Sequence, residues 1–71
     1  MNKPISQYDA VKMINKFNLT KRVGDKVQVR QDDGSVKEWT IKAQADLLGG
    51  HTPVAWFEEK SGAYSLERVI L

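Results

Sequence analysis

The sequence predicts a mainly-β fold of four or five short antiparallel strands, preceded by one N-terminal α-helix. The first observation is an alternating run at residues 24–30 that reaches an Asp33-Gly34 turn and resumes at residues 36–41. Asp-Gly between two period-2 segments is the strongest short-range signal for a β-hairpin, because Asp tolerates a positive φ and Gly has no Cβ to clash. The second observation is an apolar repeat in steps of three and four at residues 10–17, which is typical of a helix.

The size and composition of the chain limit how it is stabilised. It has 71 residues and no cysteine, so we expect a single domain over residues 1–71 without a disulfide or a Cys-based zinc site. A domain this small buries only about 60% of its unfolded surface, so its aromatic residues are expected mainly in the core. No segment approaches the ~20 apolar residues of a membrane span, and we expect a soluble, cytoplasmic protein with no membrane contact.

Residues 6–18 are expected to form one amphipathic helix. Ser6 is the expected N-cap, and Asp9 three positions later supplies the acidic half of an arrangement similar to a capping box. Asn18 and Thr20 are the expected stop signals. The residues expected on the common apolar face of the helix are Ala10, Val11, Ile14 and Phe17.

The two strands of the predicted hairpin each have one apolar face. Val27 and Val29 form this face in the first strand, and Trp39 and Ile41 continue it in the second. The expected exposed residues of the first strand are Lys26, Gln28 and Arg30. Residues 24–30 are interpreted as an exposed edge strand. Such a strand can support a homodimer by strand pairing, but Lys26 and Arg30 can equally prevent it, so we expect a monomer or a weak homodimer.

The second half of the chain carries weaker signals. Residues 43–48 fit either a short helical turn or a strand extension, and Gly49-Gly50 ends either one. The following run is apolar on both faces, which is typical of a central strand, so Trp56 and Phe57 are expected in the core. Ser61-Gly62 is the expected turn into the last strands.

Short strands, tight hairpins, a longer central loop and a short last strand together resemble the SH3-like small β-barrel over residues 24–71. The segments that carry this resemblance are the opening Gly24-Asp25-Lys26-Val27-Gln28-Val29, the Asp33-Gly34 turn and the closing Tyr64-Ser65-Leu66-Glu67-Arg68-Val69. The resemblance implies that Leu66 and Val69 bracket a tight turn and close one end of the barrel. It implies no particular function, because one fold supports many.

Gly24-Asp25-Lys26-Val27 and Leu66-Glu67-Arg68-Val69 are also similar to the two ends of plasmid-type dihydrofolate reductase, a small tetrameric enzyme that works from a central pore. In that family a Val-Gln-Ile-Tyr stretch lines the pore just before the closing segment. This chain has Glu59-Lys60-Ser61-Gly62-Ala63-Tyr64 there. The Gln and Ile that contact cofactor and substrate have no counterpart, so this activity is not expected.

No catalytic, cofactor-binding or metal-binding residues are expected, and the protein is therefore predicted not to be an enzyme. His51 is the single histidine, whereas a metal site needs three or four ligands. Gly49-Gly50 lacks the Lys-Ser/Thr pair of a phosphate-binding loop. Glu58 and Glu59 are expected on a strand, where adjacent side chains point to opposite faces, and this excludes a shared carboxylate dyad.

The charge distribution suggests nucleic-acid binding as one hypothesis. Residues 1–30 carry seven Lys or Arg and two Asp, whereas residues 31–71 carry four Lys or Arg and seven Asp or Glu. A basic half suits an anionic partner. The residues expected to form the basic nucleic-acid-binding patch are Lys12, Lys16, Lys21, Arg22, Lys26 and Arg30, with Asn15, Asn18 and Gln28 as hydrogen-bonding neighbours and Trp39 as a stacking group.

The aromatic residues suggest the other hypothesis, a small accessory or adaptor domain that binds a protein. Trp39 and Tyr64 are the rings expected at the surface in this case, although a core position is the favoured interpretation for Trp39. Asp9 and Asp25 lie among the cations and weaken their field. We therefore expect a protein partner, with nucleic acid as the alternative.

Overall fold

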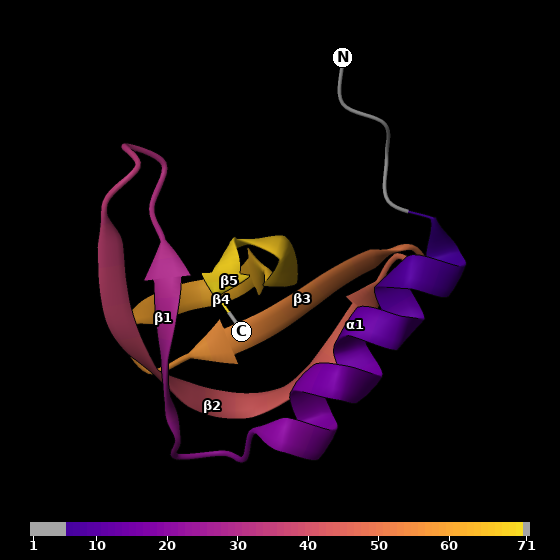
Figure 1. Cartoon of the computed structure of the whole chain (residues 1–71), viewed down its shortest axis with the longest axis horizontal. Helices are drawn as coiled ribbons and strands as arrows, with labels where there is room; N and C mark the ends of the chain where they lie inside the picture. The colour runs from indigo at the N-terminus through magenta and orange to yellow at the C-terminus, as the bar shows by residue number, and fades with distance from the viewer. Residues whose placement is uncertain (1–5, 71) are drawn as a thin grey trace.

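The computed structural model describes residues 6–70, and within them it has one α-helix and five strands (Figure 1). The elements in chain order are α1 (Gln7–Thr20), β1 (Lys26–Arg30), β2 (Val36–Leu48), β3 (Thr52–Phe57), β4 (Lys60–Ser65), the 3-10 helix η1 (Leu66–Arg68) and β5 (Val69–Ile70). The strands form one antiparallel sheet in the order β4-β3-β2-β1-β5. The predicted mainly-β fold with one N-terminal helix is confirmed.

The helix α1 begins where the sequence predicts and ends two residues later. Ser6 is its N-cap, and the Ser6 hydroxyl accepts a hydrogen bond from the N–H of Asp9 at 3.1 Å. The helix continues past Asn18 and ends at Thr20. The hydroxyl of Thr20 donates to the carbonyl of Lys16 at 2.7 Å within the last turn. No helix in the described part of the chain is long and apolar enough to cross a membrane.

The strands β1 and β2 form the predicted hairpin. Their pairing runs from Lys26 opposite Thr40 to Arg30 opposite Val36. Gly34 in the connecting loop has a φ of 89°, which explains why the turn needs a residue without a Cβ. The alternation of exposed and buried residues along β1 follows the sequence prediction.

The strand β1 is not an edge strand, so the prediction of an edge strand at residues 24–30 is wrong. Gln28 and Val29 pair with Ile70 and Val69 of β5, while β2 occupies the other side of β1. The two residues of β5 therefore cover part of the β1 backbone that was expected to be exposed. The outermost strands of the sheet are β4 and β5.

The long strand β2 continues through residues 43–48, which are strand and not a helical turn. Its first half pairs with β1 and its second half pairs with β3. The register with β3 shifts between Ile41 and Asp46, so β2 changes neighbours across an irregular stretch. The sheet curves along β2, and β3 and α1 lie next to its second half (Figure 1).

The turn between β3 and β4 lies at Glu58 and Glu59. The prediction that these two carboxylates lie on a strand is therefore wrong, and so is the prediction of a turn at Ser61-Gly62. Gly62 lies within β4 with a φ of 79°. Phe57 pairs with Lys60 across this turn, so the chain reverses direction earlier than the sequence suggests. The β3–β4 register also shifts between Ala55 and Phe57.

One hydrophobic core connects the helix to the sheet. Its buried members are Ile14, Phe17, Val27, Val29, Trp39, Ile41, Ala45, Ala55, Phe57, Leu66 and Val69. Leu66, the first residue of η1, and Val69, which follows η1, are both buried, so the expected tight turn between them is confirmed. Phe57 is fully buried as predicted, but Trp56 is only partly buried. Val11 was expected on the buried face of the helix and is 41% exposed instead.

Two amide side chains attach α1 to the second half of β2 and to the β2–β3 turn. Asn18 Nδ2 donates to the carbonyl of Ala45 at 3.1 Å, and Asn18 Oδ1 accepts from the N–H of the same residue at 2.9 Å. Near the other end of the helix, Gln7 Nε2 donates to the carbonyl of Gly50 at 3.1 Å. The helix thus lies alongside β2 beyond the point where β1 ends, with its opposite side turned away from the sheet (Figure 1).

Candidate functional site

The six residues of the predicted basic patch are distributed over three elements. Lys12 and Lys16 are one helical turn apart on α1, and Lys21 and Arg22 follow in the connection to β1. Lys26 begins β1 and Arg30 ends it, a separation of about 13 Å along a strand. Arg30 therefore lies at the opposite end of β1 from the connection.

Acidic groups lie close to the basic residues of the connection. Asp25 Oδ2 accepts a hydrogen bond from the backbone N–H of Arg22 at 2.9 Å. Lys26 lies near enough to Glu59 to contribute to the lowering of the Glu59 pKa. The carboxylates reduce the positive field around Arg22 and Lys26.

Two residues expected beside the basic patch have different positions. Asn18 uses both ends of its amide on the backbone of Ala45, so its position is set by the contact between α1 and β2. Gln28 is exposed on β1, opposite Glu38 of β2. A carboxylate directly across from this amide is unfavourable for a phosphate contact.

The two aromatic residues predicted to bind a protein are mostly covered. Trp39 is 8% exposed and lies in the core, with its ring centroid 5.5 Å from that of Phe57 and 5.1 Å from that of Tyr64. The prediction of Trp39 as a surface contact or stacking group is therefore wrong. Tyr64 is half-buried, and Lys60 Nζ lies 5.8 Å from the centre of its ring. The hydrophobic effect of burying these rings accounts for their positions.

Trp56 is the tryptophan that reaches the surface. It faces Ala43 across the β2–β3 pair, and with Lys42 these residues line a shallow hollow of about 380 Å³. The apolar run around Trp56 led to the expectation of a core residue. The alternation along β3 directs Trp56 away from the core that Ala55 and Phe57 enter.

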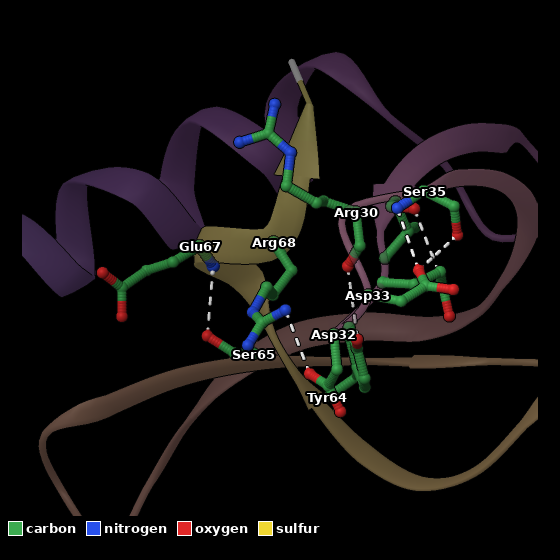
Figure 2. A network of polar contacts seen from close by, with 10 residues as sticks. Arg30, Asp32, Asp33, Ser35, Tyr64, Ser65, Glu67 and Arg68 are labelled. Carbon is green, nitrogen blue, oxygen red and sulfur yellow. Dashed lines mark hydrogen bonds and ion pairs between the residues drawn. The ribbon is translucent and has the colours of Figure 1, made fainter.

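A cluster of polar contacts joins the β1–β2 loop to η1 (Figure 2). Arg68 Nη1 forms an ion pair with Asp32 Oδ1 at 3.0 Å, and the Tyr64 hydroxyl donates to the carbonyl of Arg30 at 3.3 Å. Both partners of the ion pair are exposed to solvent, and an exposed pair contributes no more than about 1 kcal/mol to stability. We assign this cluster a structural role, which is to hold the loop against η1.

Two carboxylates at turns have lowered pKa values. Asp33 Oδ1 accepts hydrogen bonds from the hydroxyl of Ser35 at 2.6 Å and from its N–H at 2.9 Å, and these bonds lower the pKa of Asp33. Glu59 Oε1 accepts from the N–H of Thr40 at 2.7 Å and Oε2 accepts from its hydroxyl at 2.9 Å. The backbone bond is the largest cause of the lowered pKa of Glu59.

The contacts of Glu59 and His51 do not resemble a catalytic or metal centre. Glu59 joins the β3–β4 turn to β2 at Thr40, and the carbonyl of Thr40 also accepts from the N–H of Glu58 at 2.9 Å. His51 is exposed, and its Nδ1 lies 3.1 Å from the hydroxyl of Thr52. Among residues 6–70 no group of three or more His, Asp or Glu side chains is arranged to hold a metal ion.

The two most exposed large apolar side chains of residues 6–70, Leu19 and Tyr8, lie on the side of α1 that faces away from the core, and Val11 shares this side. Leu19 is 85% exposed, Tyr8 is 71% exposed and Val11 is 41% exposed. We call the residues that share this side the outer face of α1, and they are Tyr8, Val11, Lys12, Asn15 and Leu19. The spacing of 8, 11, 15 and 19 in the sequence is the signal that could have identified this second apolar stripe.

Charged groups border the outer face. Lys12 Nζ lies 5.5 Å from the centre of the Tyr8 ring, within the range of a cation–π contact. Lys16 is exposed one turn further along the helix. The outer face thus combines apolar side chains, one central amide and a basic border on a regular helix.

Comparison of the chain with protein-family models, with curated proteins and with solved structures finds no match.

Proposed function

We propose that this protein is a small non-enzymatic binding module, an accessory or adaptor domain whose partner is a protein. The observation that carries the proposal is the outer face of α1. Tyr8 and Leu19 are largely exposed there, although a chain of 71 residues needs most of its large apolar side chains for its core. Exposed apolar side chains that gather on one face, and are bordered by polar groups, are typical of interaction sites.

The arrangement of the helix supports the same proposal. The inner face of α1 packs into the core through Ala10, Ile14 and Phe17. Asn18 attaches the helix to β2, and Gln7 attaches it to the β2–β3 turn. A helix held in this way presents its outer face without a change in structure, so binding costs little conformational entropy.

The SH3-like interpretation also belongs to this proposal. It is supported by the strand order β4-β3-β2-β1-β5 and by the 3-10 helix between β4 and β5. The structure describes no hydrogen-bonded ladder between β4 and β5, so the sheet is an open one. We propose that the chain is an open relative of the small barrel in which α1 covers the second half of β2.

Nucleic acid is the second candidate partner. The observation that favours it is the set of three cations, Lys21, Arg22 and Lys26, within the connection and the start of β1. Nucleic-acid binding gives the exposed side chains of Leu19 and Tyr8 no role. We therefore rank it below a protein partner.

Affinity capture from the source cells with the purified, tagged chain tests the main proposal. The Tyr8→Ser/Leu19→Ser variant removes the apolar part of the outer face, and Val36→Ser/Ile70→Ser is the matched control because these two side chains are also exposed but lie on β2 and β5. We expect the same defined proteins with the wild type and the control, and their loss with the helix variant. Equal capture by all three proteins contradicts the proposal, and circular dichroism verifies that each variant is folded.

A further inference from the structure

We infer that the outer face of α1 docks one amphipathic helix of its partner, and that this helix carries acidic residues along its border. The inference rests on the proposed protein-binding function and specifies the partner's chemistry. Its basis is the combination of helical spacing, basic border and central amide on one surface.

The shape of the outer face fits a helix. Tyr8 and Leu19 are eleven residues apart, so the stripe is about 16 Å long, and it is one side chain wide. Side chains at steps of three and four form ridges that pack into the grooves of another helix at a shallow crossing angle. A convex ridge of this kind offers no hydrogen-bonding edge for an added strand and no pocket for a small molecule.

The charges around the outer face favour an acidic partner. Residues 7–22 contain Lys12, Lys16, Lys21 and Arg22 but one acidic residue, Asp9, which gives a net charge of +3. Within residues 6–70 the ion pair of the structure joins Arg68 to Asp32, so none of these four cations has a carboxylate partner there. Opposite charges across an interface favour association, and like charges oppose it. A second copy of this chain would place +3 against +3 and is disfavoured.

Asn15 lies between the apolar side chains of the outer face and is exposed. Insertion of this face into a lipid surface would bury the amide without a hydrogen-bonding partner, which costs free energy. A partner helix with an amide or hydroxyl group at the matching position satisfies it. A single polar residue within an apolar helix interface also fixes the register of the two helices.

The small size of the outer face predicts a weak, transient complex. Three apolar side chains on four turns of helix form an interface below the ~1,200 Å² that separates transient from stable complexes. Titrations by NMR are suited to this range, because they detect binding in the millimolar range and assign it to residues.

The test is a titration of the full ¹⁵N-labelled chain with two designed helical peptides. The first has Leu at i, i+3, i+7 and i+11 with Gln in the centre and Glu along the border, and the second has the same sequence with Lys in place of every Glu. We expect the acidic peptide to shift the amide signals of residues 8–19, and the basic peptide to leave them unchanged. Equal binding of both peptides, or shifts confined to β1 or to the hollow at Trp56, overturns the inference.

A charge-exchange experiment makes the test specific. The Lys12→Glu/Lys16→Glu variant is expected to bind the acidic peptide with about tenfold lower affinity and to bind the basic peptide, because the border of the outer face then carries negative charge. The matched control, Lys37→Glu/Lys42→Glu, changes the net charge equally on β2 and is expected to leave the affinity within about twofold. An equal loss of affinity for the acidic peptide in both double variants shows a general charge effect and contradicts docking at the outer face.

Anionic vesicles and duplex DNA are the remaining probes. Stronger shifts of residues 8–19 with phosphatidylglycerol vesicles, or of residues 21–26 with DNA, would replace the inference by a lipid or a nucleic-acid partner. The experiments can disprove the acidic helical partner without disproving the protein-binding function. If capture depends on Tyr8 and Leu19 while neither peptide binds, the protein-binding function stands and the helical acidic partner is wrong.

Discussion

Asn18 illustrates how a single side chain replaces a neighbouring strand. Beyond Ile41, whose N–H and carbonyl still bond to Asp25 and Gly24, the strand β2 has no strand partner on the β1 side within residues 6–70. The amide of Asn18 supplies the donor and the acceptor that a strand would supply to Ala45. An amide is suited to this because it has the same polar groups as a peptide bond. The residue is therefore expected to be structural and not a contact for a ligand.

Substitution of Asn18 tests this role. Asn18→Ala leaves the N–H and the carbonyl of the buried residue Ala45 without partners, and we expect the free energy of unfolding to fall by about 1–3 kcal/mol. Urea denaturation followed by tryptophan fluorescence measures the change. Asn15→Ala is the control on the exposed side of the same helix, and we expect a change within about 0.5 kcal/mol. Equal effects of the two substitutions would show that the amide pair does not stabilise the fold.

Glu59 provides a pH-dependent contact between the β3–β4 turn and β2. Its pKa in the folded protein lies below the ordinary 4.5, chiefly because of the hydrogen bond from the N–H of Thr40. A carboxylate with a lowered folded pKa stabilises the protein fully above its unfolded pKa, and this contribution is lost as the pH falls through the folded pKa. Asp33 acts in the same direction because Ser35 lowers its pKa.

We therefore expect the free energy of unfolding to decrease on acidification below about pH 4.5. The Glu59→Gln variant is expected to show a shallower decrease than the wild type, since it cannot be protonated. Urea midpoints between pH 3 and pH 7 measure both slopes. Glu58→Gln is the adjacent control, because the Glu58 side chain makes no hydrogen bond within the described residues, and it is expected to keep the wild-type slope.

At the scale of the elements, the two tryptophans differ in burial because they lie on different strands, Trp39 on β2 and Trp56 on β3. Trp39 is 8% exposed and contacts Phe57, whereas Trp56 on the adjacent strand lines the hollow with Ala43. Trp39→Ala is expected to cost about 3–5 kcal/mol because it leaves a cavity in the core. Trp56→Ala is expected to cost less than half as much, since water already reaches the indole.

Thermal denaturation of the two Trp→Ala variants compares these costs. For a domain of this size each 1 kcal/mol shifts Tm by about 4–8 °C, so the two transitions are expected to differ clearly. A loss of partner binding in Trp39→Ala is expected only together with unfolding. A folded Trp39→Ala variant that no longer binds would support the original surface role of Trp39.

The elements that the sequence predicted well are those that local rules determine. The Asp33-Gly34 turn and the alternation of Val27 and Val29 lie within one hairpin, and the Ser6 cap acts on its own helix. Residues 43–48 carry no such local signal, because their strand form depends on pairing with β3 and on the contact with α1.

The positions of the candidate site residues depended on long-range packing. The exposure of Val11 follows from how α1 rotates against β2 and β3, and a shift of this kind exchanges core and surface positions. The bonds from Thr40 to Glu59 join residues 19 positions apart. The short strand β5 covers β1 from the other end of the chain, so the error about the edge strand also arose from a distant pairing.

At the scale of the whole molecule, the distribution of charge distinguishes the two candidate partners. The net charge is +2, and the cations of the N-terminal half extend from α1 to the far end of β1 with Asp25 and Glu59 among them. A phosphate backbone would therefore meet about three of them at a time, those at Lys21, Arg22 and Lys26. Each neutralised phosphate contributes about −0.9 to the slope of log affinity against log salt for duplex DNA.

We expect fluorescence anisotropy with duplex and single-stranded DNA and RNA to show binding at low salt only, with a slope no steeper than about −3. Charge reversal at Lys16, Lys21 and Arg22 is expected to abolish that weak binding, whereas Tyr8→Ser/Leu19→Ser is expected to leave it unchanged. Binding that persists at physiological salt with a steeper slope, and that is lost on the same charge reversal, would instead make the basic residues the working site. The apolar outer face would then be incidental, because counterion release needs no exposed leucine.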